Sequence, residues 1–200
     1  MIGGLRGDRG QATIEVALLL SLLIMPLVFG LVEMGFLFSS HLTLSAATRE
    51  GARMGSNLAN GGNPLGCGGG QSPNAASVDP QIVASVERSL TGAGTEITLA
   101  NVTEIDIYKS TATGGVTGTS INVWKYNFNG GPVIDGDPLD FSQFSVGWTA
   151  CSRNNVIPAD ALGVTVKYNY QPKTPLRYFL PGVSTWSLSD STVMVLNATQ

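Results

Sequence analysis

The pattern of apolar residues predicts a membrane-spanning helix near the N-terminus. Residues 16–38 read VALLLSLLIMPLVFGLVEMGFLF, and only Ser21, Pro26 and Glu33 interrupt their apolar character. The uncharged part, residues 16–32, is about 25 Å long as a helix, whereas the hydrocarbon core of a bilayer is roughly 30 Å thick. With a little snorkelling at its ends the run crosses a bilayer. We therefore expect a spanning helix at about 16–38.

The helix is expected to continue beyond the membrane. The stretch HLTLSAATREGARMGSNL at 41–58 contains no proline, and the first turn signal is NGGNP at 60–64. Leu44, Ala47 and Met54 follow one apolar stripe within it. These features predict one long helix over 11–58, apolar in its first half and amphipathic in its second.

A Gly-rich loop at 59–78 is followed by the pattern of a second helix. The segment DPQIVASVERSLTG begins at Asp79, which is expected at the N-cap, with Pro80 at the first helical position. Its apolar residues recur at helical spacing, and Gly92 is expected to end the helix.

After this helix the apolar residues alternate with polar ones. The alternation predicts strands in EIDIYKS, SINVWKYNF, LGVTVKYNYQ and STVMVLN, and WSLS at 186–189 is expected to extend the last of them. The fold class is therefore α+β. A long N-terminal helix precedes a head domain at 79–200 with one helix and an antiparallel sheet of four or five strands.

Composition favours an exported protein. Charged residues make up 12% of the chain, against about a quarter in ordinary soluble domains, and there are 25 glycines. Arg6 and Arg9 precede the apolar run, which favours a cytoplasmic N-terminus and an exported head. The formal net charge of −3 argues against a nucleic-acid partner.

Export also bears on the cysteines. The chain has two, Cys67 and Cys151, and an isolated pair outside the cytoplasm most simply forms a disulfide. The alternative is two free thiols.

The sequence offers little material for catalysis. The sole histidine, His41, lies at the expected membrane boundary, so the head cannot build a Ser-His-Asp set or a His-rich metal site from it. Asp135, Asp137 and Asp140 in IDGDPLD leave two interpretations, a calcium site or a plain acidic turn, and the EF-hand spacing is not met. We expect no catalytic residues, no cofactor and no metal.

Three motifs in the N-terminal quarter resemble a known family. GQATIEV at 10–16, LVEMG at 31–35 and ATREGAR at 47–53 are similar to the TadE-like family. Its members are minor pilins or pseudopilins of the tight-adherence (Tad/Flp) branch of the type IV pilus superfamily. The sequence departs from the pattern at Val16, where an aromatic residue often follows the glutamate.

This resemblance implies a processing site and a set of partners. A prepilin peptidase would cut between Gly10 and Gln11, so residues 1–10 would be a short leader and Glu15 the fifth residue of the mature chain. The protein would have no enzymatic activity. It would work with other pilin subunits and the pilus assembly platform, in the cytoplasmic membrane, in a cell-surface pilus, or in both.

The chemistry of the motif is consistent with such a cut. Cleavage would create an ammonium group at Gln11, which lies four residues before Glu15 and thus next to it on a helix. The ammonium of one subunit could also meet Glu15 of the next. Either arrangement gives the carboxylate a counter-charge that is absent before processing.

Glu33 leaves two interpretations open. It follows Glu15 by eighteen residues, which is five helical turns, so both side chains point the same way at a separation of about 27 Å. The carboxylate either contacts a neighbouring pilin or reaches the headgroup water.

Two other classes of protein remain as alternatives. One is a single-pass anchored protein whose extracytoplasmic head is a binding or sensor domain and forms no filament. The other is a secreted protein whose signal peptide is cut after Ala47. The sequence leaves open whether the head serves adhesion, pilus initiation or secretion.

Overall fold

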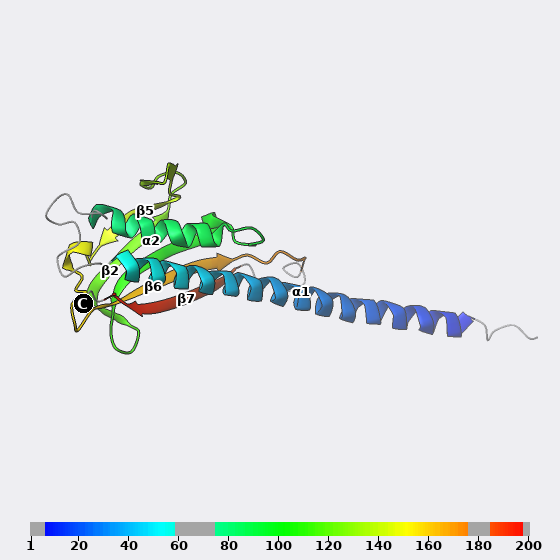
Figure 1. The fold of residues 1–200 in the computed structure, drawn as a ribbon. Coiled ribbons are helices and arrows are strands. Elements are labelled where there is room, and N and C mark those ends of the chain that lie inside the picture. Colours follow the sequence, from blue (N-terminus) through cyan, green and yellow to red (C-terminus); the bar gives the residue numbers. More distant parts are fainter. Residues whose placement is uncertain (1–6, 59–74, 176–184, 198–200) are drawn as a thin grey trace, which may run out of the picture. The chain divides into compact units, whose positions relative to one another are not determined.

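A computed structural model describes residues 7–58, 75–175 and 185–197 of the chain. The chain divides into two compact units, residues 1–38 with 171–186 and residues 39–170 with 187–200. The N-terminal helix runs from the first unit into the second (Figure 1).

The long N-terminal helix is confirmed. Helix α1 extends from Gly7 to Leu58 without interruption and contains Pro26. Its second half buries one stripe of mostly small residues, which comprises Ser40, Leu44, Ala47, Thr48, Gly51, Ala52, Gly55 and Ser56. Leu44 and Ala47 were expected on this stripe, whereas Met54 is only half-buried.

The second helix, α2, spans Ala75–Leu90 and begins one turn earlier than the sequence predicts. The prediction of Asp79 as the N-cap, with the loop reaching Val78, was therefore wrong. Val78 is fully buried on the same stripe as Ile82 and Val86, and this packing outweighs the backbone hydrogen bond that Pro80 cannot donate.

The α+β head has a five-stranded antiparallel sheet, as expected. Its strands lie in the order β5-β2-β1-β6-β7. Four of them match the predicted segments: β1 (Val102–Ser110), β2 (Val116–Tyr126), β6 (Ala161–Tyr170) and β7 (Trp186–Val195). Strand β5 (Phe141–Val146) was not predicted; it is an edge strand whose residues are largely exposed, so it shows no clear alternation.

The segment IDGDPLD forms a tight hairpin. Strands β3 (Val133–Ile134) and β4 (Asp137–Pro138) pair across Asp135 and Gly136, whose φ angles are 54° and 96°. Asp-Gly is the preferred pair for such a turn because both positions need positive φ. Two short 3-10 helices, η1 (Leu99–Asn101) and η2 (Ala150–Ser152), complete the described elements.

The core of the head lies where the second half of α1 and α2 pack on one face of the sheet (Figure 1). The approach is close at two glycines. A Cβ on Gly51 would lie 2.5 Å from Val86 Cγ2, and one on Gly55 would lie 2.9 Å from Leu162 Cδ2. Small residues at this spacing therefore let the helix backbone approach both α2 and β6.

Charged side chains form ion pairs across three strands on the opposite face of the sheet. Lys167 donates to Glu104 at 2.7 Å and lies 2.9 Å from Asp106, while Lys125 lies 3.6 Å from Glu104. The hydrogen bond from Lys167 lowers the pKa of Glu104, and the bond to Glu104 raises the pKa of Lys167. These pairs link β1, β2 and β6.

Gly51→Leu is expected to lower the free energy of unfolding of the full chain by about 2 kcal/mol, because the side chain overpacks the contact with Val86. Thermal and denaturant unfolding in detergent micelles, followed by circular dichroism, measures the change. Ala46→Leu is the matched control, since Ala46 is exposed on the same helix. Equal stability of the two variants would contradict the close approach.

Glu104→Gln is expected to lower the free energy of unfolding by about 0.5 kcal/mol at pH 7. The effect is small because Glu104 and its partner Lys167 are partly exposed. A lowered folded-state pKa means that the carboxylate stabilises the head above its ordinary pKa of 4.5, and that this contribution disappears as the pH falls through the lowered value. Unfolding curves of both proteins should thus converge at about pH 2. A difference in stability that persists at this pH would show that the ionised Glu104 carboxylate is not its cause.

Candidate functional site

The first half of α1 presents apolar side chains on most of its surface. From Ile14 to Phe38 its large apolar residues are 44–70% exposed, apart from Phe29, Phe36 and Leu37, which are half-buried. Within the described residues, α1 is the one helix long and apolar enough to cross a membrane, and none of its most apolar window is buried. It is therefore a candidate membrane anchor.

The predicted processing site lies at the exposed start of this helix. A side chain at Gly10 would meet no atom within 4 Å, and Gln11 is also exposed. The Gln11 Nε2 donates a hydrogen bond to Glu15 Oε1 at 3.3 Å. In the uncut chain, Glu15 thus contacts the side chain of the residue whose backbone nitrogen would become the new N-terminus.

Glu33 lies in different surroundings. Its side chain is 1% exposed and accepts hydrogen bonds from the backbone N–H of Lys173 at 3.1 Å and of Thr174 at 2.9 Å. The Thr174 hydroxyl donates a further bond at 2.6 Å. These donors belong to its own chain, an arrangement that neither sequence interpretation included. A role of Glu33 in assembly stays a prediction.

The ATREGAR motif separates into a buried and an exposed side. On the buried side, the Thr48 hydroxyl donates to Asp190 Oδ2 of β7 at 2.6 Å, next to Gly51. On the exposed side, Arg53 forms an ion pair with Glu50, which lowers the pKa of Glu50 and raises that of Arg53. The buried residues of the motif thus pack α1 against the head.

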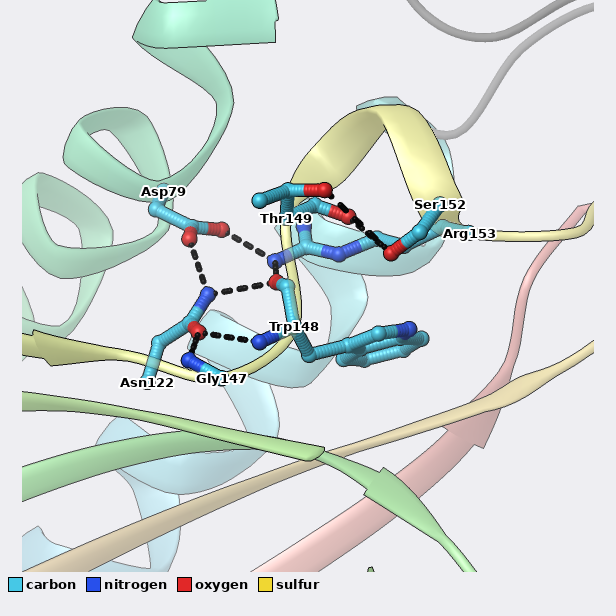
Figure 2. A network of polar contacts seen from close by, with 7 residues as sticks. All are labelled: Asp79, Asn122, Gly147, Trp148, Thr149, Ser152 and Arg153. Atoms are coloured by element: carbon cyan, nitrogen blue, oxygen red, sulfur yellow. Dashed lines mark hydrogen bonds and ion pairs between the residues drawn. The ribbon is translucent and has the colours of Figure 1, made fainter. Parts of the chain in front are cut away.

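A buried polar network that the sequence did not reveal joins α2, β2 and η2. Figure 2 shows Asp79 and Asn122 pointing toward the Arg153 guanidinium and the Trp148 backbone. Asn122 donates to Asp79 Oδ2 and to the Trp148 carbonyl, both at 2.7 Å, and its own oxygen accepts from the backbone N–H groups of Gly147 and Trp148. One fully buried amide thereby holds the turn after β5.

Arg153 supplies the charge at the centre of this network. It donates to Asp79 Oδ1 at 2.5 Å, and its guanidinium lies 4.7 Å from the centre of the Trp148 ring. Arg153 directly follows η2, which carries Cys151. Cys151 is not a free thiol. Cys67 lies outside the described residues, so its pairing with Cys151 stays a prediction.

Two carboxylates of the acidic turn, those of Asp135 and Asp140, form contacts within the head. Arg88 pairs with Asp135 at 3.2 Å, and Asp140 accepts from the Asn129 backbone N–H at 2.8 Å. Glu87 lines a cavity of about 490 Å³ beside the hairpin, and burial raises its pKa. Among the described residues no three His, Cys, Asp or Glu side chains are grouped to hold a metal ion.

Asp79→Asn is expected to destabilise the chain by about 3 kcal/mol, because it leaves the Arg153 charge buried without its counter-ion. Asp135→Asn is the matched control, since it removes a carboxylate from an ion pair that is 63% and 76% exposed, and its cost should stay within about 0.5 kcal/mol. Denaturant unfolding of the full chain compares the two. A similar loss of unfolding free energy in both variants would contradict the importance of the buried Asp79–Arg153 pair for stability.

Comparison with known proteins agrees with the motifs. A search of curated proteins and of solved structures finds no match to this chain. Residues 10–53, however, match the family described as TadE-like protein. The matched stretch includes Gly10, Glu15, Glu33 and the ATREGAR motif, and thus confirms the predicted resemblance. Residues 10–53 are therefore similar to the TadE-like family, a structural, non-enzymatic family of pilin-like proteins associated with Tad pili.

Proposed function

We propose that this protein is a minor pilin or pseudopilin of a Tad-type pilus system, anchored in the cytoplasmic membrane before assembly. The single observation that carries the proposal is the TadE-like segment 10–53, which coincides with an exposed apolar helix. In this proposal α1 first resides in the bilayer and then packs against the helices of other pilins.

Processing at Gly10–Gln11 is the step that prepares α1 for assembly. Before the cut, Glu15 accepts a hydrogen bond from an uncharged donor, the Gln11 side-chain amide. A prepilin peptidase then releases residues 1–10, and the Gln11 nitrogen becomes an ammonium one helical turn from Glu15. Both bonds have an ionised acceptor, but the ammonium adds a full positive charge, and its Coulomb attraction to the carboxylate grows where water is excluded. The cut thus supplies the counter-charge that a buried Glu15 needs, from its own chain or from the next subunit.

The exposed side of α1 fits helix packing. Gly30 and Gly35 each border open space, since a Cβ at either position would meet no atom within 4 Å. Small residues let neighbouring helices approach closely where lipid is the solvent. The head then presents a surface for adhesion, initiation or secretion. The assembly platform binds the membrane anchor.

The structure of α1 bears on the secreted alternative. Cleavage after Ala47 would separate Leu44 and Ala47 from the head, although both are fully buried in its core. The anchored binding domain without a filament is the remaining rival, and it differs from a pilin in its N-terminus.

N-terminal mass spectrometry of the native protein is expected to find a chain that begins at Gln11. A start at Met1 would support the uncut anchor, and a start at Thr48 would support secretion; either result would contradict the proposal.

Glu15→Gln should leave membrane insertion intact but reduce incorporation into pili by about tenfold, which corresponds to the loss of one charge-assisted bond. Immunoblots of sheared pili and of membranes measure the distribution. Glu50→Gln is the matched control, because it removes a carboxylate from the same helix outside the anchor. Equal incorporation of the two variants would rule out the role of Glu15.

A further inference from the structure

Glu33 is a buried carboxylate in the exposed, apolar first half of α1. Its neighbours Val32 and Met34 are 44% and 60% exposed, whereas Glu33 itself is 1% exposed. An ionised carboxylate at membrane depth is costly unless it is paired or hydrogen-bonded. The residues that cover Glu33 therefore decide how it can be placed relative to the lipid.

These residues come from the segment that follows β6. We call residues 171–174, which read QPKT, the strap. Two successive backbone N–H groups of the strap and one hydroxyl converge on the Glu33 carboxylate and engage both of its oxygens. Successive N–H groups in a turn form an anion-binding concavity, and hydrogen bonds to a carboxylate are among the strong ones. The strap is thus a built recognition site for this carboxylate.

A lysine of the strap lies against an aromatic residue of α1, and this combination is typical of a membrane interface. The Lys173 ammonium lies 5.5 Å from the centre of the Phe36 ring, and the Lys173 side chain is exposed. Aromatic and lysine side chains gather where the hydrocarbon core meets the headgroups, because each has an apolar body and a polar end. Phe36 lies one helical turn after Glu33, so the two contacts hold the strap at one level of α1.

We propose that the strap rests at the phospholipid headgroups, and that Glu33 is the positioning residue that fixes it there. The membrane-embedded part of α1 then ends at Val32 rather than at Phe38. Residues 16–32 span about 25 Å, which a bilayer accommodates by modest thinning or snorkelling. Because both oxygens of the buried carboxylate accept hydrogen bonds from the strap, Glu33 in this proposal does not pair with a pilin ammonium, and Glu15 has that role. The placement at the interface does not depend on the pilus function.

Hydrogen exchange of the full chain in phosphatidylglycerol-containing nanodiscs tests whether Glu33 fixes the strap through its hydrogen bonds. Pro172 and Pro175 carry no backbone N–H, so a peptide over 171–175 reports chiefly Lys173 and Thr174. Glu33→Ala should speed their exchange by about tenfold or more, and Thr174→Val, which removes only the hydroxyl, should speed it less. Met34→Ala is the matched control and should change nothing. Unchanged exchange in Glu33→Ala would overturn the positioning role.

Labelling with a membrane-impermeant maleimide tests the position of the boundary in a chain that keeps Glu33. Leu27→Cys and Phe38→Cys introduce thiols at sites that are both 62% exposed on α1. We expect Phe38→Cys to react at least about tenfold faster, because it lies on the water side of the strap while Leu27 lies within the hydrocarbon. Equally slow labelling of both would show that the embedded span runs through Phe38, and would overturn the proposed boundary.

Discussion

The close contact of α1 with α2 and β6 at Gly51 and Gly55 is the interaction on which the head depends. With no side chain at either position, the helix backbone comes near enough for Val86 and Leu162 to pack directly on it. Two hydrogen bonds also join α1 to β7. The Thr48 hydroxyl donates to Asp190, and the Ser56 hydroxyl donates to the Val195 carbonyl at 2.8 Å.

Three glutamates of the same helix, Glu15, Glu33 and Glu50, each have a different partner. Glu15 contacts the Gln11 amide, Glu33 contacts backbone N–H groups of the strap, and Glu50 contacts Arg53. The differences follow the surroundings. An exposed carboxylate needs only a surface ion pair, which contributes little, whereas a buried one needs several donors. Glu15 has a single neutral donor at 3.3 Å, which suits a group that receives its full partner only after processing.

The head has its own polar centre in the contact of Asp79, Asn122 and Arg153 (Figure 2). A buried ion pair adds little net stability, but removing one partner is costly. The bonds of this network connect the turn after β5 and the residue that follows η2 to α2. Since η2 carries Cys151, the same network places that sulfur at a defined position on the head.

The processing residues Gly10 and Gln11 were implied by the resemblance to the TadE-like family, and they stay a prediction. Local pattern was enough to predict the long helix and four strands of the sheet. Each depends on periodicity, length or near-neighbour chemistry that a short window of sequence contains. The remaining features depend on residues far apart in the chain. The early start of α2 follows from the burial of Val78, strand β5 exists because β2 pairs with it, and Asp79 is a network residue because Asn122 and Arg153 reach it. Above all, the sequence shows that Glu33 needs a partner, since a carboxylate in an apolar run is costly. Only the tertiary structure brings Lys173 and Thr174, 140 and 141 residues away, to that carboxylate.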